Sequence, residues 1–150
     1  MLILSGCAST RPSYPNTKTE SSAKVIGDSP NLVRFFSNGE SGVHFVEVDG
    51  IYVAESFVSG YTKEIFLNPG KHRLTIQLHG SEYTAAQTEI SIEVEAQKTY
   101  LFTAQKVGLA FDVTLSLCKP DGTAETTLSQ FRVAARSNPQ PTVMPIFIAK

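Results

Sequence analysis

Residues 71–79 read Lys-His-Arg-Leu-Thr-Ile-Gln-Leu-His, and this stretch decides the fold class. Its side chains alternate, so in an extended chain Leu74, Ile76 and Leu78 share one face with His72, while the other face is polar. Such alternation is typical of an antiparallel strand with one buried face. The stretch therefore predicts a half-buried strand.

Two further stretches, Thr88–Glu95 and Leu109–Cys118, alternate in the same way. In the second, the register predicts Leu109 on the apolar face and Cys118 on the polar face at a strand end. Shorter β-rich runs complete a set of eight candidate strands: Leu32–Phe36, Val43–Val48, Ile51–Phe57, Lys63–Leu67, Arg73–Leu78, Thr88–Val94, Thr99–Ala104 and Leu109–Leu117. Their spacing predicts an all-β fold, a mostly antiparallel β-sandwich of about seven to nine strands.

Three turn sequences separate these runs. Asp49-Gly50 favours a two-residue hairpin in which both residues have positive φ. Asn68-Pro69-Gly70 fits a type II turn with positive φ at the glycine. Lys119-Pro120-Asp121-Gly122 fits a type I turn closed by a glycine, which would turn the preceding strand back on itself.

The C-terminal part of the chain is less clear. Thr126–Arg136 fits a helix through Leu128, Phe131 and Ala135, or a strand through Phe131, Val133 and Ala135, and the surrounding strands favour a strand. Residues 137–150 contain three prolines, which exclude a helix or a central strand. We therefore expect a β-sandwich domain over residues 31–136 and an extended, Pro-rich C-terminal segment.

Composition limits the functional classes. The chain has 150 residues and carries 13 basic against 14 acidic side chains, a formal net charge of -1. This length suits one domain, and the balance of charge lacks the basic footprint of a nucleic-acid-binding protein. No stretch approaches the about 20 apolar residues of a membrane-spanning helix. These observations argue against a multidomain enzyme, a nucleic-acid-binding protein and an integral membrane protein.

Leu4-Ser5-Gly6-Cys7 resembles the lipobox of bacterial lipoproteins. The resemblance implies cleavage before Cys7 and a diacylglycerol on its thiol, so that residues 1–6 would be the remnant of a signal peptide. Only these six residues precede the cysteine, and we expect a start further upstream. The alternative interpretation is a chance match of four common residues.

Ala8–Pro30 is rich in Ser, Thr and Pro, which predicts a flexible tether. With Cys7 it would form the lipid anchor and tether, residues 7–30, which reach at most roughly 75 Å. No aspartate follows Cys7 closely, and by the same resemblance this implies an outer-membrane lipoprotein facing the periplasm. Cys118 would then have no disulfide partner within the chain.

Catalytic and metal-binding patterns are missing from the sequence. His44, His72 and His79 have no metal-ligand spacing, and the last two would lie on opposite faces of one strand. A row of acidic residues on one strand, Glu89, Glu93 and Glu95, is typical of a solvated face. Without a phosphate loop or a nucleophile motif, we expect neither an enzyme nor a cofactor.

Tyr61 and Tyr83 lie in predicted loops at strand ends, where sandwiches carry binding residues. Their rings could contact a glycan or a protein partner. The alternative is that each ring packs over the end of the core.

Val46-Glu47-Val48-Asp49-Gly50, followed by Leu67-Asn68-Pro69-Gly70-Lys71-His72-Arg73-Leu74, resembles PEGA-type domains and related lipoprotein β-domains. The resemblance covers about a quarter of the chain, and its motif residues are turn and core residues. It implies a small envelope β-sandwich in which His72 has a structural position. We therefore expect a non-enzymatic, lipid-anchored envelope lipoprotein that binds or scaffolds another envelope component; the alternative is a glycan- or peptidoglycan-associated binding module.

Overall fold

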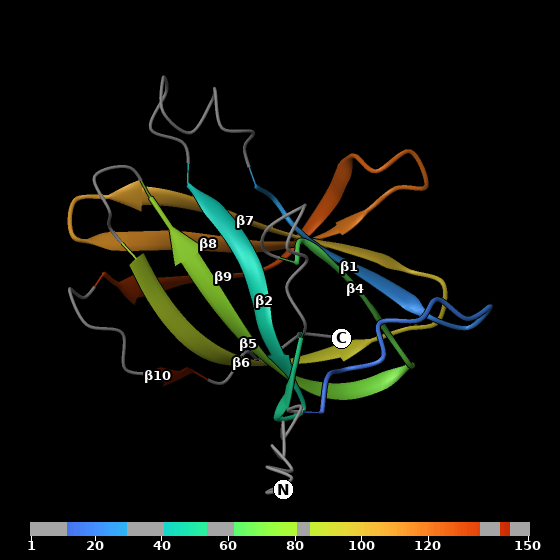
Figure 1. The fold of residues 1–150 in the computed structure, drawn as a ribbon. Coiled ribbons are helices and arrows are strands. Elements are labelled where there is room, and N and C mark those ends of the chain that lie inside the picture. The colour runs from blue at the N-terminus through green and yellow to red at the C-terminus, as the bar shows by residue number, and fades with distance from the viewer. Residues whose placement is uncertain (1–11, 30–40, 54–61, 81–84, 136–141, 145–150) are drawn as a thin grey trace, which may run out of the picture.

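Ten strands in two five-stranded sheets make up the parts of the chain that this computed structural model describes, which are residues 12–29, 41–53, 62–80, 85–135 and 142–144 (Figure 1). No helix occurs among these residues, and the predicted all-β fold is confirmed. The first sheet contains, in spatial order, β4 (Glu64–Leu67), β1 (Ala23–Gly27), β7 (Thr99–Val107), β8 (Ala110–Cys118) and β9 (Ala124–Ala134). The second contains β10 (Thr142–Met144), β6 (Ala85–Val94), β5 (Gly70–His79), β2 (Gly42–Val48) and β3 (Ile51–Tyr52).

Two of the three predicted turns are confirmed, and of the third only the positive φ at its glycine is confirmed. Asp49 and Gly50 have φ of 52° and 79° in the β2–β3 hairpin, as a two-residue turn with two positive φ values requires. Gly70, the first residue of β5, has the predicted positive φ, but its value of 129° differs from the about 80° of a type II turn. At the β8–β9 turn the amide of Gly122 donates to the carbonyl of Lys119 over 2.9 Å, and Gly122 has φ 85°. These connections are local, and their sequences determine them.

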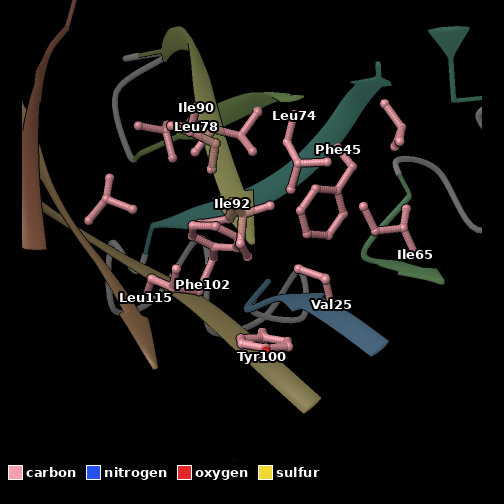
Figure 2. Packing of buried hydrophobic residues seen from close by; sticks show 14 of the residues in the cluster. Val25, Phe45, Ile65, Leu74, Leu78, Ile90, Ile92, Tyr100, Phe102 and Leu115 are labelled. Carbon is pink, nitrogen blue, oxygen red and sulfur yellow. The ribbon is translucent and has the colours of Figure 1, made fainter. Parts of the chain in front are cut away.

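The core lies between the inner faces of the two sheets. Figure 2 shows Phe45 and Leu74 from the second sheet opposite Val25 and Phe102 from the first. The rings of Phe45 and Phe102 meet edge to face, with centroids 6.2 Å apart. The alternation predicted for β5 and β6 is confirmed, because their apolar residues are buried: Leu74, Ile76, Leu78, Ile90, Ile92 and Val94.

The two sheets are joined along one side by backbone hydrogen bonds. The amide of Val43 donates to the carbonyl of Asp28 over 2.8 Å, and the amide of Phe45 donates to the carbonyl of Thr62 over 3.0 Å. Since these bonds connect β2 with the chain next to β1 and β4, the sandwich is closed on this side.

The flexible tether predicted over residues 7–30 is wrong for residues 13–16, which contact β3 and β4, and for residues 23–27. Residues 23–27 form β1, which pairs antiparallel with β4 and parallel with β7. Ala23 and Val25 are fully buried, and the burial of apolar side chains outweighs the entropic cost of ordering this segment. The folded unit therefore includes a central strand that precedes the expected boundary at residue 31.

The polar-face position predicted for Cys118 is also wrong. The register between β8 and β9 shifts after Leu115 and again after Leu117, and such irregularities bend and twist a strand pair. Ser116 and Cys118 are consequently buried, although the predicted alternation of β8 places both on its polar face. At the other end of β8, Leu109 lies in the turn and is 84% exposed, contrary to its predicted apolar-face position.

The structure agrees with the predictions for residues 126–136 and for the C-terminal segment as far as β10 shows it. Residues 126–136 were ambiguous between helix and strand, and β9 confirms the strand. β10 lies within the Pro-rich segment 137–150 and pairs parallel with β6 at the edge of its sheet. The predicted strand Leu32–Phe36, and the predicted strand Ile51–Phe57 after residue 53, lie outside the described residues.

Candidate functional site

The outer face of β7, β8 and β9 carries an open depression of about 700 Å³. Two rows of side chains cross the three strands there in register. One row is Gln105, Asp112 and Arg132, and the other is Thr103, Thr114 and Gln130. We call these six residues the polar groove.

The polar groove forms because paired residues of the three strands point to the same face of the sheet, with polar and apolar pairs alternating along the strands. Between its two rows lie Ala104, Val113 and Phe131, which pack in or against the core instead. Neighbouring strands lie about 4.8 Å apart, and residues two apart on a strand are about 6.6 Å apart. The six polar groups are therefore spread over an area on which a small ligand can make several hydrogen bonds.

An ion pair fixes one end of the polar groove. Arg132 Nε donates to Asp112 Oδ1 over 2.6 Å, and Arg132 Nη2 donates to Asp112 Oδ2 over 2.9 Å. This two-point contact holds the pKa of Asp112 below its ordinary value, so the carboxylate is charged at neutral pH. Because the two side chains remain 63% and 43% exposed, the paired charges stay open to a ligand.

The polar groove presents several hydrogen-bonding groups and two charged groups. Its two hydroxyls and two amides can donate and accept hydrogen bonds, and the ion pair adds one cationic and one anionic group. The arrangement suits a neutral or zwitterionic polar ligand.

A second polar cluster, around His72, connects two turns. His72 Nδ1 lies 2.7 Å from Asp49 Oδ2 in the β2–β3 turn, and His72 Nε2 lies 2.7 Å from the carbonyl oxygen of Asn68 in the β4–β5 turn. The amide of Arg73 donates to Asp49 Oδ1 over 2.8 Å. Both ring nitrogens of His72 are engaged in these contacts. The cluster therefore holds the β2–β3 and β4–β5 turns together.

Burial of the Asp49 carboxylate opposes its ionisation, but the hydrogen bonds from Arg73 and His72 outweigh it and lower its pKa. Asp49 is therefore charged at neutral pH, which suits its contacts with the Arg73 amide and the His72 ring.

The other two histidines lie together. His44 on β2 and His79 on β5 have ring centroids 4.5 Å apart, and His44 is only 6% exposed. Burial, followed by the nearby His79 and Lys63, lowers the pKa of His44 to about 3, and burial also lowers the pKa of His79. Both rings are therefore neutral at neutral pH. No local pattern indicates this pairing, because the strands that bring the rings together are joined by tertiary contacts.

The acidic and thiol groups of the described ranges do not form a metal site. These ranges hold no cluster of three or more His, Cys, Asp or Glu side chains that could bind a metal ion. In the predicted acidic row, Glu93 and Glu95 are exposed and Glu89 Oε2 lies 3.5 Å from Arg73 Nε. Burial, with Asp121 nearby, raises the pKa of the Cys118 thiol and keeps it protonated.

The residues singled out from the sequence, Cys7, Tyr61 and Tyr83, lie outside the described residues. The polar groove was missed, although its residues belong to predicted strands. Polar alternation in Thr99–Ala104 and Leu109–Leu117 was the available signal, but the third strand was ambiguous. Across the described segments, no helix is long and apolar enough to cross a membrane. In comparisons with known proteins, no family model, curated protein or solved structure matches this chain.

Proposed function

We propose that this chain is a non-enzymatic lipoprotein of the bacterial cell envelope, anchored through a lipid on Cys7, whose polar groove binds an envelope glycan. The anchor rests on the lipobox-like residues before Cys7. The ligand rests on one structural observation, the two in-register rows of hydroxyl, amide and charged side chains in the polar groove.

The lining of the polar groove favours a glycan over a protein partner. The centres of protein–protein interfaces are enriched in aromatic side chains and depleted of charged ones. The polar groove instead presents Gln105, Gln130 and a paired carboxylate and guanidinium, which complement hydroxyl and acetamido groups of sugars. Its volume of about 700 Å³ falls within the range of small-ligand sites, about 300–1,000 Å³.

The double variant Gln105→Ala/Gln130→Ala is expected to weaken binding to purified peptidoglycan by about tenfold. Each amide contributes about 0.5–1.5 kcal/mol of net hydrogen bonding, and 1.4 kcal/mol is a factor of ten. Sedimentation with sacculi and calorimetry with soluble glycan fragments measure the affinity. The matched control is Glu125→Ala/Thr126→Ala, on β9 but outside the polar groove, which should bind like the unaltered protein.

Two results would contradict this ligand assignment. One is that the unaltered protein does not bind sacculi or any soluble glycan fragment. The other is that the polar-groove variant and its control bind equally well. Capture of a protein partner that the polar-groove variant fails to bind would instead favour the scaffolding interpretation.

Cys7→Ser, made in the chromosome of the source bacterium, is expected to move the protein from the membrane fraction to the soluble fraction. A serine hydroxyl replaces the thiol that would carry the lipid, and anchoring by more than one acyl chain is lost with it. Fractionation and mass spectrometry of the N-terminal peptide measure the change. A Cys7→Ser variant that remains membrane-bound, or an unmodified Cys7 in the unaltered protein, would refute the anchor.

A further inference from the structure

The N-terminal segment that the sequence assigned to a flexible tether is fastened to one end of the sandwich. Ser13 forms a β-bridge with Tyr52 of β3, and the amide of Tyr14 donates to the Tyr52 carbonyl over 2.7 Å. The Tyr14 hydroxyl donates to the carbonyl of Phe66 on β4 over 2.7 Å. In Figure 1 this blue segment meets the β2–β3 hairpin at the bottom of the molecule.

Asn16 continues the attachment along the outer edge of β4. Its Nδ2 donates to the carbonyl of Glu64 over 2.8 Å, and its Oδ1 accepts from the amide of Phe66 over 2.8 Å. One amide side chain thus forms the pair of bonds that a neighbouring strand would form. Residues 13–16 are therefore part of the folded unit.

This attachment shortens the chain between Cys7 and the fold. Five residues, Ala8 to Pro12, separate Cys7 from Ser13, so the two α-carbons are at most about 20 Å apart. The tether expected from the sequence would have reached roughly 75 Å. An acylated Cys7 would hold one particular end of the sandwich at the bilayer.

The end next to Ser13 has side chains that suit a lipid surface. Ile51, in the β2–β3 hairpin, is 41% exposed although it is a large apolar residue. The guanidinium of Arg73 lies beside Gly50 in the same hairpin, with its Nε 3.5 Å from Glu89 Oε2 and its side chain 57% exposed. An apolar side chain can enter the headgroup region, and a guanidinium can pair with lipid phosphate.

We propose that the β2–β3 hairpin end of the sandwich lies against the bilayer, with Ile51 in the headgroup region and Arg73 on lipid phosphate. The proposal rests on the lipid anchor proposed above and adds an orientation to it. The β7–β8 turn lies at the opposite end of β2, because the amide of Lys106 donates to Oγ of Ser41, which precedes β2. Leu109 in that turn is exposed, so position 109 serves as the reference for the end that would face away from the bilayer.

The chain contains no tryptophan, so a single introduced tryptophan reports its own surroundings. Ile51→Trp and Leu109→Trp are made in the full chain carrying Cys118→Ala, which leaves Cys7 as its one thiol. Each protein is coupled through Cys7 to a maleimide lipid in phosphatidylcholine–phosphatidylglycerol vesicles that contain brominated lipid. We expect at least twofold quenching and a blue shift for Ile51→Trp, and neither for Leu109→Trp.

Equal quenching of the two tryptophans, or preferential quenching at position 109, would overturn the orientation. A 20-residue Gly/Ser insertion between Ala8 and Ser9 should abolish the quenching of Ile51→Trp, and quenching that survives it would show that the short connection is not its cause. Because the maleimide lipid supplies the anchor, this experiment does not depend on acylation in cells. Failure of the anchor in cells and failure of the orientation on vesicles are therefore separate results.

Discussion

A chain that begins at Asn31 is expected not to fold cooperatively, whereas a chain that begins at Pro12 should fold like the full protein. The shorter chain lacks β1, which lies between β4 and β7 and contributes the fully buried Ala23 and Val25. Without it, β4 loses its partner strand and the edge of β7 faces water, which exposes core and unpaired backbone groups together. Far-UV circular dichroism during thermal unfolding measures cooperativity.

A single substitution tests the same strand in the full chain. A methyl group at Gly27 would overlap the carbonyl oxygen of Val43, so Gly27→Ala should cost about 3 kcal/mol of unfolding free energy. Lys24→Ala, on the same strand, removes only an exposed ion pair with Glu64 and should cost less than about 1 kcal/mol. If Gly27→Ala were as mild as Lys24→Ala, or if the chain from Asn31 folded normally, β1 would not be an essential strand.

Stability is expected to fall by about 2 kcal/mol between pH 7.5 and pH 5.0 because of His44. Its pKa is about 3 in the folded protein and about 6.5 in the unfolded chain. The unfolded chain therefore binds a proton that the folded protein does not, and stability that is complete above pH 6.5 is lost as the pH falls toward 3. The lowered pKa of His79 acts in the same direction. Urea unfolding at both pH values measures the loss.

His44→Gln is the matched variant, since glutamine is polar but does not titrate. Its stability should change less between the two pH values than that of the unaltered protein. The interval lies above the range in which Asp49 and Asp112 titrate, because their pKa values are lowered from 3.8. An unaltered protein equally stable at pH 7.5 and pH 5.0 would contradict the burial of a neutral His44.

The sequence predicted correctly those features that depend on residues close together in the chain, namely the buried face of a strand and the conformation of a turn. The alternation of β5 and β6 determined which of their side chains are buried, and the positive φ values of Asp49 and Gly50 follow from the turn they form. β1 was missed because its alternation covers only a few residues inside a Ser/Thr/Pro-rich stretch. Its pairing with β7 joins residues more than seventy positions apart, which no local pattern records.

The polar groove illustrates the same limit at the candidate site. Its strands were visible in the sequence, but its two rows exist only through the cross-strand registers of β7 with β8 and of β8 with β9. The irregular pairing near Leu117 changed the position of Cys118 as well, from a predicted polar face to a buried site. Register between strands is set by packing, so a one-residue error exchanges the two faces of a strand.

By itself, the sequence determined the fold class, the half-buried strands and the turns, because these depend on side-chain period and on the conformations that Gly, Asp and Pro allow. The tertiary structure decided which strands are neighbours, that His44 meets His79, and where the polar groove lies. It also decided that Tyr14 and Asn16 belong to the fold, because a few hydrogen bonds to distant strands leave no pattern in the chain. Because these two residues attach to the fold, the segment between Cys7 and the sandwich is short, and the proposed orientation at the bilayer rests on this.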